Sequence, residues 1–430
     1  MLPAERLERD ALASQQGVRL SRLLATIHGR NPFYTRKLDD AGIDVAALRL
    51  PTDLSRLPFT LRAELIADQR ATPPWGTALT EPIERYTRYC QTSSTTGRPL
   101  RWIDTNESWQ WMLECWKAVF RGARVAPGDR VFFPFSFGPF LGFWTAFDAA
   151  SQTGLHCVPG GGMSSELRLA TIEATGATVV CCTPTYALRL AEVAALERRA
   201  VPLAAGTVRV IIVAGEPGGS IPATRENIET SWGARVIDHY GLTEVGPIAF
   251  ECWEAPGFLH LNEDAFLCEV LEQGSDRAVP DGEPGELVVT NLGRDACPVI
   301  RYRTGDIVVR RSEPCACGRT WARLERGVMA RADDMINIRG VNVYPAGIEA
   351  VIRGFEDVAE FRSIVTRVHG MRSLRVELEV TPGRGDEEVV AHRVAAGLRE
   401  ALGMTVAVHV VPAGTLPRFE MKARRFMVEE

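Results

Sequence analysis

Four short polar segments follow one another in a fixed order along the chain of 430 residues, and their residue types are those that bind a nucleotide. The segments are TSSTTGRP at 92–99, DHYGLTE at 238–244, YRTGD at 302–306 and RADDMINIRG at 331–340. Hydroxyl groups and backbone amides can surround a polyphosphate, and carboxylates can accept ribose hydroxyls or bind a hard cation. Each segment alone also fits a turn or linker, so the prediction of a nucleotide site rests on their order.

The first segment is the candidate phosphate loop. Its hydroxyls precede a glycine, and an arginine adds positive charge. It lacks the lysine of the Walker pattern, which argues against an ordinary P-loop. A solvated turn is the alternative, because serine and threonine cluster in loops. The residues predicted here to bind ATP are Ser93, Ser94, Thr95, Thr96, Gly97 and Arg98.

The second segment combines an aromatic residue with an acid. Tyr240 ends a predicted strand and can lie against adenine, and Gly241 lets the backbone approach a ligand. Thr243 and Glu244 can reach phosphate and Mg²⁺, since a hard cation prefers oxygen ligands. The alternative is a strand-to-helix turn in which the threonine caps the helix and the glutamate favours its N-terminus. The other nucleotide-binding candidates of this segment are Asp238 and His239.

The third and fourth segments each supply a charged candidate. Asp306 follows a glycine turn and can accept hydrogen bonds from two ribose hydroxyls, although an ordinary hairpin acid would look the same. Arg331 can touch ribose or phosphate, and Asp333 marks the passage into the C-terminal region. A solvated linker is the competing interpretation of this last segment.

Strand and helix patterns alternate between residues 177 and 244 and must position these segments. Such alternation indicates parallel strands joined by crossover helices, and ligands of these sheets bind at the carboxyl ends of the strands. Segment 214–217 follows a strand directly, as does segment 238–244. This placement adds Ala214, Gly215, Glu216 and Pro217 to the candidate site.

The remaining patterns complete the predicted architecture. Leucines at helical spacing predict an N-terminal helical cap that stops near 31–33, and Thr105 is a candidate N-cap for a helix with a core-facing apolar stripe. Short strands and turns begin at Leu261. The predicted fold class is α/β, with a large N-terminal domain of parallel sheets, helices and a β-rich subdomain at 1–332. A small mobile α+β domain is expected at 333–430.

Composition restricts the class of partner. A net charge of −5 gives no general basic field, which disfavours nucleic acid and anionic membrane as main partners. No segment has the pattern of a signal peptide or reaches transmembrane length. Ten cysteines without an export signal favour reduced thiols in the cytoplasm.

The chain resembles the phenylacetate-CoA ligase branch of the adenylate-forming superfamily. The resemblance is carried by NPFYTRKLDDAGID, CCTPTYAL, DHYGLTE, RYRTGDI, RADDMINIRGVNVYP and LPRFEMKARR, which span nearly the whole chain. It implies that a carboxylate attacks the α-phosphorus of ATP to give an acyl adenylate and pyrophosphate, after which a thiol displaces AMP. The implied cofactors are ATP, Mg²⁺ and coenzyme A, and a homodimer is expected.

The resemblance also assigns roles in the C-terminal lobe. Lys422 would bridge the acyl carboxylate and the α-phosphate, and the lobe would then rotate about Asp333. The alternative for Lys422 is a basic tail, because arginines surround it. The loop facing the thiol channel would contain Arg339, Gly340 and Val341.

Three positions depart from the family pattern. Ser94 stands where glycine is usual, Arg98 where lysine is usual, and Ala330 precedes Arg331 where glycine is usual. None of these changes removes an essential group. We therefore expect an active enzyme with altered ATP affinity.

An aromatic stretch, FFPFSFGPFLGFWTAF, is the expected acyl pocket, because the resemblance places the lining of that pocket here. Its apolar character favours an aryl or arylacetic acid over a charged or sugar acid. Buried core aromatics are the alternative. The predicted substrate-binding residues are Phe137, Gly138, Phe140, Ala214, Tyr240 and Gly241.

Three cysteines and a histidine form a candidate metal site: Cys252, His260, Cys315 and Cys317. These ligands from two turn-rich segments suit a closed tetrahedral zinc site that would staple the β-rich subdomain. The single residue between Cys315 and Cys317 is tighter than the common spacing of two, which weakens the prediction. Free buried thiols beside a surface histidine are the alternative.

The function that the resemblance implies, together with the residues of the four polar segments and the aromatic stretch, is an ATP- and magnesium-dependent aryl-CoA ligase for a benzoate, anthranilate, hydroxybenzoate or phenylacetate type of acid. The runner-up passes the same adenylate to the phosphopantetheine of a carrier protein. A non-catalytic nucleotide-binding regulator is a third hypothesis. The joint presence of Glu244, Asp306, Arg331 and Lys422 argues against that third hypothesis.

Overall fold

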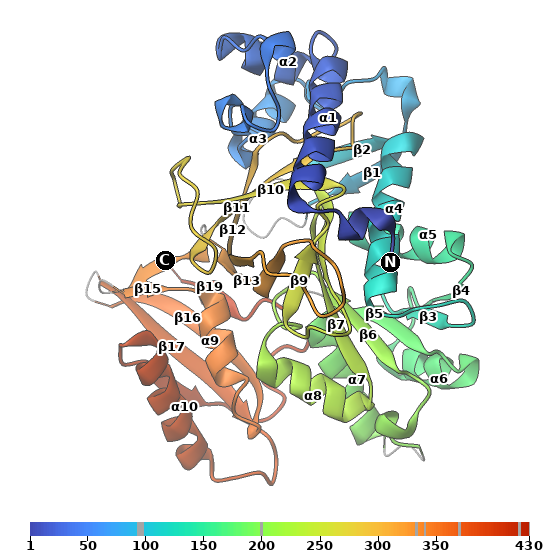
Figure 1. The fold of residues 1–430 in the computed structure, drawn as a ribbon. Coiled ribbons are helices and arrows are strands. Elements are labelled where there is room, and N and C mark those ends of the chain that lie inside the picture. The colour runs from blue at the N-terminus through green and yellow to red at the C-terminus, as the bar shows by residue number, and fades with distance from the viewer. Residues whose placement is uncertain are drawn as a thin grey trace.

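A computed structural model describes residues 1–92, 99–197, 201–331, 334–338, 341–368, 371–419 and 423–429 (Figure 1). Several predicted site residues lie outside the described residues. They are Ser93, Ser94, Thr95, Thr96, Gly97, Arg98, Asp333, Arg339, Gly340 and Lys422.

The N-terminal region is helical, as predicted. Its α-helices are α1 (Arg9–Ile27), α2 (Pro32–Asp40) and α3 (Arg62–Ala71), with short 3-10 turns at Pro3–Arg6, Val45–Ala47, Leu54–Arg56 and Ile83–Arg85. The predicted stop near 31–33 also begins the second helix, because the Asn31 side chain accepts a hydrogen bond from the Tyr34 amide at 3.1 Å. These helices pack on one half of the large sheet, in which the strands run antiparallel.

The candidate phosphate loop is flanked by a two-stranded hairpin. Its strands β1 (Tyr86–Gln91) and β2 (Arg101–Thr105) pair antiparallel. Helix α4 (Asn106–Gly122) follows directly, and Thr105 caps it by accepting the Ser108 amide at 3.3 Å. The predicted cap is thus confirmed.

The large sheet contains eleven strands within the described residues, in the order β10-β11-β12-β13-β9-β8-β7-β6-β5-β3-β4. Its parallel half consists of β3 (Arg130–Phe133), β4 (His156–Pro159), β5 (Val179–Cys182), β6 (Val210–Ala214) and most of β7 (Arg235–Leu242). The antiparallel half adds β8 (Gly246–Glu251), β9 (Phe258–Leu261), β10 (Phe266–Leu271), β11 (Pro284–Asn291), β12 (Tyr302–Arg311) and β13 (Arg323–Arg331).

Crossover helices cover both faces of the parallel half. On one face lie α4 and α5 (Leu141–Gln152), and on the other lie α6 (Ser165–Thr175), α7 (Pro184–Leu196) and α8 (Pro222–Trp232), with a 3-10 turn at Leu203–Ala205. Neighbouring strand residues alternate between the two cores: Val179 packs with the first set and Val180 with the second. The predicted parallel α/β arrangement is confirmed.

Strand β7 joins the two halves, since it pairs parallel with β6 and antiparallel with β8. The segment 238–244 therefore leads into a strand. The strand-to-helix turn considered as its alternative is wrong. Thr243 and Glu244 are residue types that favour a helix N-terminus, but no helix begins at either of these described residues. Gly246, at φ 117°, instead starts a buried strand of the same sheet.

The C-terminal lobe is a separate α+β unit, at the lower left of Figure 1. It contains a small hairpin, two helices and a four-stranded sheet in the order β18-β17-β16-β19. The elements are β14 (Ile336–Ile338), β15 (Val341–Val343), α9 (Pro345–Ile352), β16 (Val358–Val368), β17 (Met371–Val380), α10 (Glu387–Leu402), β18 (Ala407–Val410) and β19 (Phe426–Val428). The large sheet ends at Arg331, next to the proposed boundary at 332/333.

No described helix has the length and hydropathy needed to cross a bilayer.

Candidate functional site

Tyr240, Asp306 and Arg331 come together although they lie far apart in sequence. The Tyr240 hydroxyl donates to Asp306 Oδ2 at 2.5 Å, and Arg331 Nη1 lies 3.5 Å from Asp306 Oδ1 across the β12–β13 pair. Strands β7 and β12 are separated by three others, which in a flat sheet would place them about 19 Å apart. The antiparallel half must therefore curl over the edge of the parallel half. Burial and the neighbouring Asp306 raise the pKa of Tyr240, which keeps its hydroxyl a donor.

Glu244 is another buried acid of the candidate site. The Tyr302 hydroxyl lies 3.3 Å from its Oε1, and Arg62 Nε lies 3.7 Å from the same oxygen. Arg62 also donates to Thr92 Oγ1 at 3.4 Å, at the start of the candidate phosphate loop. Arg62 is thus a cation beside this loop that sequence reasoning missed. Its position in α3 carries no local signal for this contact.

The turn that carries Thr243 and Glu244 rests on a buried ion pair. Arg294 Nη1 donates to the carbonyl oxygens of Thr243 at 2.8 Å and Glu244 at 3.1 Å. The other side of the guanidinium contacts Asp104 bidentately at 2.6 and 2.7 Å, and both side chains are nearly fully buried. This arginine fixes the backbone from which Glu244 extends.

The side chains of Asp238 and His239 are turned toward protein partners. Asp238 Oδ2 accepts from Ser220 Oγ at 2.5 Å, and burial raises the pKa of Asp238 to about 6. His239 Nδ1 lies 2.8 Å from the Ala249 carbonyl, and its ring packs against Trp116 with centroids 4.4 Å apart. Burial lowers the pKa of His239 to about 4. Each side chain thus has a protein partner, and the prediction that Asp238 and His239 bind ATP stays a prediction.

Segment 214–217 lies at the carboxyl end of β6, as predicted. Gly215 adopts φ 96°, which a side chain would strain. The Glu216 carboxylate accepts the Thr185 amide at 2.9 Å and the Ala423 amide at 2.8 Å, so both oxygens face protein donors. The predicted ATP contact of Glu216 stays a prediction, because each carboxylate oxygen can accept a second hydrogen bond.

Phe137, Gly138 and Phe140 lie in one aromatic cluster between β3 and α5. The Phe137 ring contacts Phe135, Trp144 and Phe147 at centroid distances of 5.0 to 5.2 Å. Gly138 accepts from Trp144 Nε1 at 3.1 Å, and a methyl group added there would meet the Phe140 ring at 3.1 Å. Phe137, Gly138 and Phe140 are only half buried, which leaves aromatic surface for a ligand.

The same segment is tied to the phosphate side of the site. The Gln91 amide, at the end of β1, donates to the Pro139 carbonyl at 2.8 Å. The candidate phosphate loop begins at Thr92, directly after Gln91. An acid bound at the aromatic cluster would therefore lie near the strand that leads into that loop.

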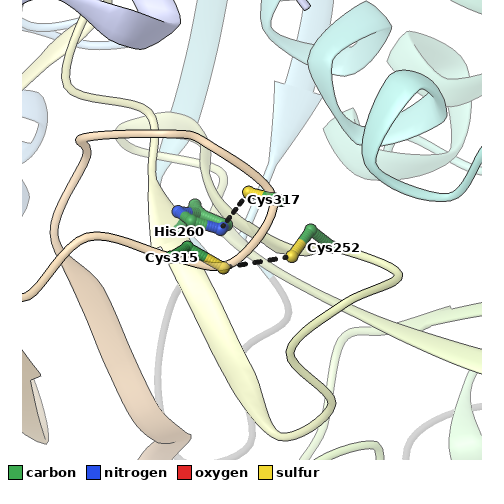
Figure 2. Close-up of side chains that lie close together, drawn as sticks. All are labelled: Cys252, His260, Cys315 and Cys317. Carbon is green, nitrogen blue, oxygen red and sulfur yellow. Dashed lines mark hydrogen bonds between the residues drawn. The ribbon is translucent and has the colours of Figure 1, made fainter.

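Cys252, His260, Cys315 and Cys317 come together, as predicted (Figure 2). Their ligand atoms all lie within 4.8 Å of one another, with Cys252 Sγ 3.7 Å from Cys315 Sγ and Cys317 Sγ 3.5 Å from His260 Nε2. A tetrahedral zinc ion with ordinary bond lengths requires separations of about 3.8 Å between sulfurs and about 3.6 Å between sulfur and nitrogen. The alternative of a surface histidine is wrong, because His260 is fully buried.

The environment of this cluster favours a thiolate at Cys317, whereas the hydrogen bond with Cys317 and burial raise the pKa of Cys252. Hydrogen bonding from Cys252, together with His260 and Arg319, lowers the pKa of Cys317 to about 2. The thiolate is the form that binds a metal. The donor set and its spacing therefore fit zinc.

The remaining predicted position in the lobe is Val341. It begins β15 and pairs with Ile338 in the β14–β15 hairpin, packed against the apolar core of the lobe. Its predicted neighbours in the CoA channel lie outside the described residues.

Two family models match separate parts of the chain, and curated relatives and solved structures match nearly all of it. The AMP-binding enzyme family matches residues 50–293, and the AMP-binding enzyme C-terminal domain matches residues 340–429. The phenylacetate-coenzyme A ligase of Thermus thermophilus is 33% identical over 97% of this chain and 96% of its own length. That of Escherichia coli K12 is 33% identical over 98% and 96%.

Two solved structures of 2-hydroxyisobutyryl-CoA ligase resemble this chain to different degrees. In the postadenylation state with 2-HIB-AMP, that protein has a TM-score of 0.93 at 27% identity, covering 99% of this chain and 91% of its own. In the thioesterification state with CoA the TM-score is 0.75 at 28% identity, with the same coverage. The chain therefore belongs to the adenylate-forming enzymes, in their phenylacetate-CoA ligase-like branch, whose members are AMP-forming acid–thiol ligases.

Proposed function

We propose that this ligase activates an aromatic or arylacetic acid, with phenylacetate the first candidate, and transfers the acyl group to coenzyme A. The observation that carries the acid class is the half-buried aromatic cluster around Phe137, tied to β1 through Pro139. The names of the relatives that align with nearly the whole chain support phenylacetate.

In the proposed reaction, a carboxylate oxygen attacks the α-phosphorus of ATP, and pyrophosphate leaves. The CoA thiol then attacks the acyl carbon of the adenylate, and AMP leaves. Both substrates of the first step are anions, so positive charge and orientation must supply most of the effect. Arg331, Arg62 and Lys422 would supply this charge.

The other residues would bind and orient the nucleotide. Asp306 would accept the ribose hydroxyls, with Tyr240 holding its carboxylate and packing near the base. Glu244 offers a buried oxygen ligand that fits Mg²⁺, which would neutralise phosphate charge when bound. The predicted homodimer and cytoplasmic location stay predictions.

We expect ATP–pyrophosphate exchange with phenylacetate to exceed exchange with benzoic, aminobenzoic and hydroxybenzoic acids by at least about tenfold, because one added methylene in an apolar pocket can change discrimination by roughly 10- to 200-fold. The measurement is radiolabelled pyrophosphate exchange against this panel. 2-Hydroxyisobutyrate serves as the non-aromatic control. Preference for that control would contradict the aromatic pocket.

The identity of the thiol that accepts the acyl group can be tested with the same purified enzyme and acid. With free CoA, the proposed ligase should release AMP rapidly and form the aryl thioester. Adenylate that persists until a carrier protein is added would instead establish the runner-up hypothesis.

We further propose that the cluster of Cys252, His260, Cys315 and Cys317 binds one structural zinc ion. It would join the end of β8 and strand β9 to the β12–β13 connection. That connection also anchors the N-terminal segment, because Arg319 lies 2.9 Å from the buried Glu5 carboxylate. A metal here would stabilise the fold without touching the reaction.

Purified protein should contain about one zinc per chain, and Cys317→Ser should lose it and unfold at a lower temperature, because structural zinc contributes directly to folding free energy. Elemental analysis and thermal unfolding measure both. Cys157→Ser, at another partly buried cysteine, is the matched control and should keep its zinc. Metal-free protein with reduced cysteines and unchanged stability would contradict the staple.

A further inference from the structure

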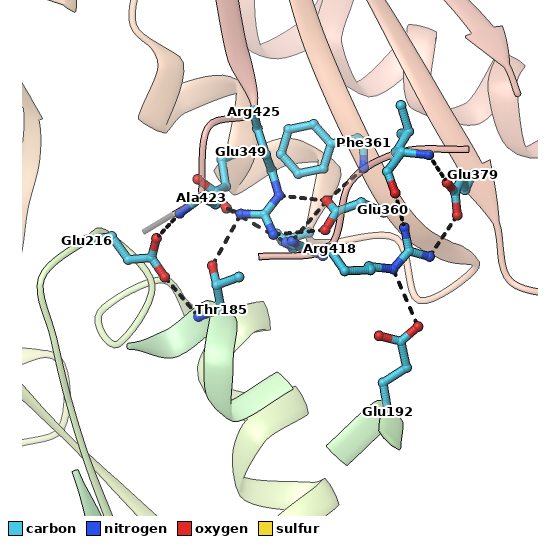
Figure 3. Close-up of polar contacts among 12 residues, drawn as sticks. Thr185, Glu192, Glu216, Glu349, Glu360, Phe361, Glu379, Arg418, Ala423 and Arg425 are labelled. Carbon is cyan, nitrogen blue, oxygen red and sulfur yellow. Dashed lines mark hydrogen bonds and ion pairs between the residues drawn. The ribbon is translucent and has the colours of Figure 1, made fainter. Parts of the chain in front are cut away.

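Two arginines from the last segment of the lobe reach helix α7 of the large domain (Figure 3). Arg418 Nε donates to Glu192 Oε1 at 3.4 Å, and Arg425 Nη1 donates to Thr185 Oγ1 at 3.3 Å. Both partners lie on α7, Thr185 in its first turn and Glu192 further along. The lobe therefore contacts one helix of the large domain at two points.

Carboxylates of the lobe hold both arginines in place. Arg425 bonds Glu360 through Nε at 2.6 Å and Nη2 at 3.0 Å, and its side chain is 6% exposed. Arg418 Nη2 bonds the buried Glu379 at 2.7 Å. Because these guanidinium groups are already oriented, contact with α7 requires little further ordering of side chains.

Glu216 forms the third connection. Its partner in the lobe, Ala423, is next to Lys422 in the chain. Glu216 Oε1 accepts the Thr185 amide at the start of α7, where a negative charge is favourable. Its Oε2 accepts the amide of Ala423, the residue that follows Lys422, at 2.8 Å. One carboxylate thus joins the N-terminus of α7 to the backbone beside the expected catalytic lysine.

We propose that Glu216 is a positioning residue for the adenylation step, which holds the backbone beside Lys422 against the large domain. The contacts of Arg418 with Glu192 and of Arg425 with Thr185 complete this latch on both sides of Lys422. The inference rests on the proposed two-step reaction, in which the lobe takes a different arrangement for each step.

The latch belongs to one arrangement of the lobe. All three connections join the lobe to the large domain, so rotation of the lobe would separate every pair. The chain matches the postadenylation structure better than the thioesterification structure. Breaking the latch should therefore slow adenylation without slowing thioester formation.

Glu216→Gln keeps the size of the side chain but replaces one acceptor oxygen with an NH₂ group, which cannot accept from an amide. We expect kcat for adenylation to fall about tenfold, equivalent to about 1.4 kcal/mol. The KM for ATP should stay unchanged, whereas loss of a direct ATP contact would raise it. Thioester formation from supplied acyl adenylate and CoA should stay at the wild-type rate.

Two further variants separate the latch from a general loss of structure. Glu192→Gln should cause a smaller loss in the same direction, because its contact with Arg418 is longer and more exposed. Glu226→Gln, on the exposed face of α8, removes the same charge and should change neither half-reaction. Equal loss of both half-reactions in Glu216→Gln would overturn the proposal.

Hydrogen exchange provides a readout that does not depend on activity. The peptide containing Ala423 should exchange its amide hydrogens faster in full-length Glu216→Gln protein than in wild type or Glu226→Gln. Unchanged exchange would overturn the latch. If wild-type protein activates no aryl acid, the proposed substrate class fails, and amide exchange alone decides the latch.

Discussion

Replacing Lys422 with alanine should reduce adenylation about 100- to 1,000-fold while leaving thioester formation from supplied acyl adenylate within a few-fold of wild type. This is the loss in rate expected when one preorganised electrostatic donor is removed from an active site. The lysine would lie between two anions only while the first bond forms, so its charge stabilises that transition state and not the second. Pyrophosphate exchange measures the first step, and CoA-dependent AMP release from synthetic adenylate measures the second.

The chain offers close controls for this variant. Arg424→Ala removes an exposed positive charge two residues further on and should leave both half-reactions unchanged. The chain has three lysines among 49 lysine and arginine residues, and the other two are paired: Lys37 with Glu64 at 2.5 Å and Lys117 with Glu114 at 2.6 Å. Lys422→Arg should not restore the rate, since a planar guanidinium does not replace a compact ammonium group. Equal loss in both half-reactions would refute the assigned role.

Arg294→Met should lower the free energy of unfolding by about 3–5 kcal/mol, because it leaves the Asp104 carboxylate buried without its partner. It should also reduce adenylation, because the carbonyl groups of Thr243 and Glu244 lose their common donor. Urea unfolding and pyrophosphate exchange measure the two effects.

A second substitution separates these effects. Asp104→Asn combined with Arg294→Met removes both charges and should recover most of the lost stability, but adenylation should stay low because the turn still lacks its donor. Arg277→Met breaks an exposed pair with Glu272 and should leave the free energy of unfolding nearly unchanged, because water screens this pair. A double variant as unstable as the single one would show that the unpaired carboxylate is not the cause.

Local signals in the sequence predicted the elements well. The cap at Thr105, the alternating strands and helices, and the position of segment 214–217 after β6 are all confirmed. Each of these features depends on residues that are close together in the sequence, or on a hydrophobic repeat of a few residues. The four candidate metal ligands also lie together, as predicted, because cysteine and histidine in turns carry a chemical signal that does not depend on the fold.

Contacts between distant segments could not be predicted in this way. Tyr240 meets Asp306 only because the sheet curls, and no periodicity encodes that curl. Arg62 approaches Glu244, and Glu216 meets Ala423, through the packing of elements far apart in sequence. The alternation of side chains along a strand predicts that Asp238 and His239 lie on opposite faces of the sheet. Only the packed structure identifies the partners that bury them.

The single sheet that carries Tyr240, Glu244 and Asp306 has a consequence for how this enzyme can diversify. These residues keep their spacing because hydrogen-bonded strands connect them, whereas the aromatic cluster lies in the β3–α5 connection and the lobe meets α7 through polar side chains. If the proposed function holds, substitutions near Phe137 should change the preferred acid while the nucleotide-binding residues keep their positions. Substitutions at Glu192 or Arg418 should change the rate of adenylation relative to thioester formation without changing the preferred acid. Substrate choice and the relative rates of the two steps would then be open to independent selection.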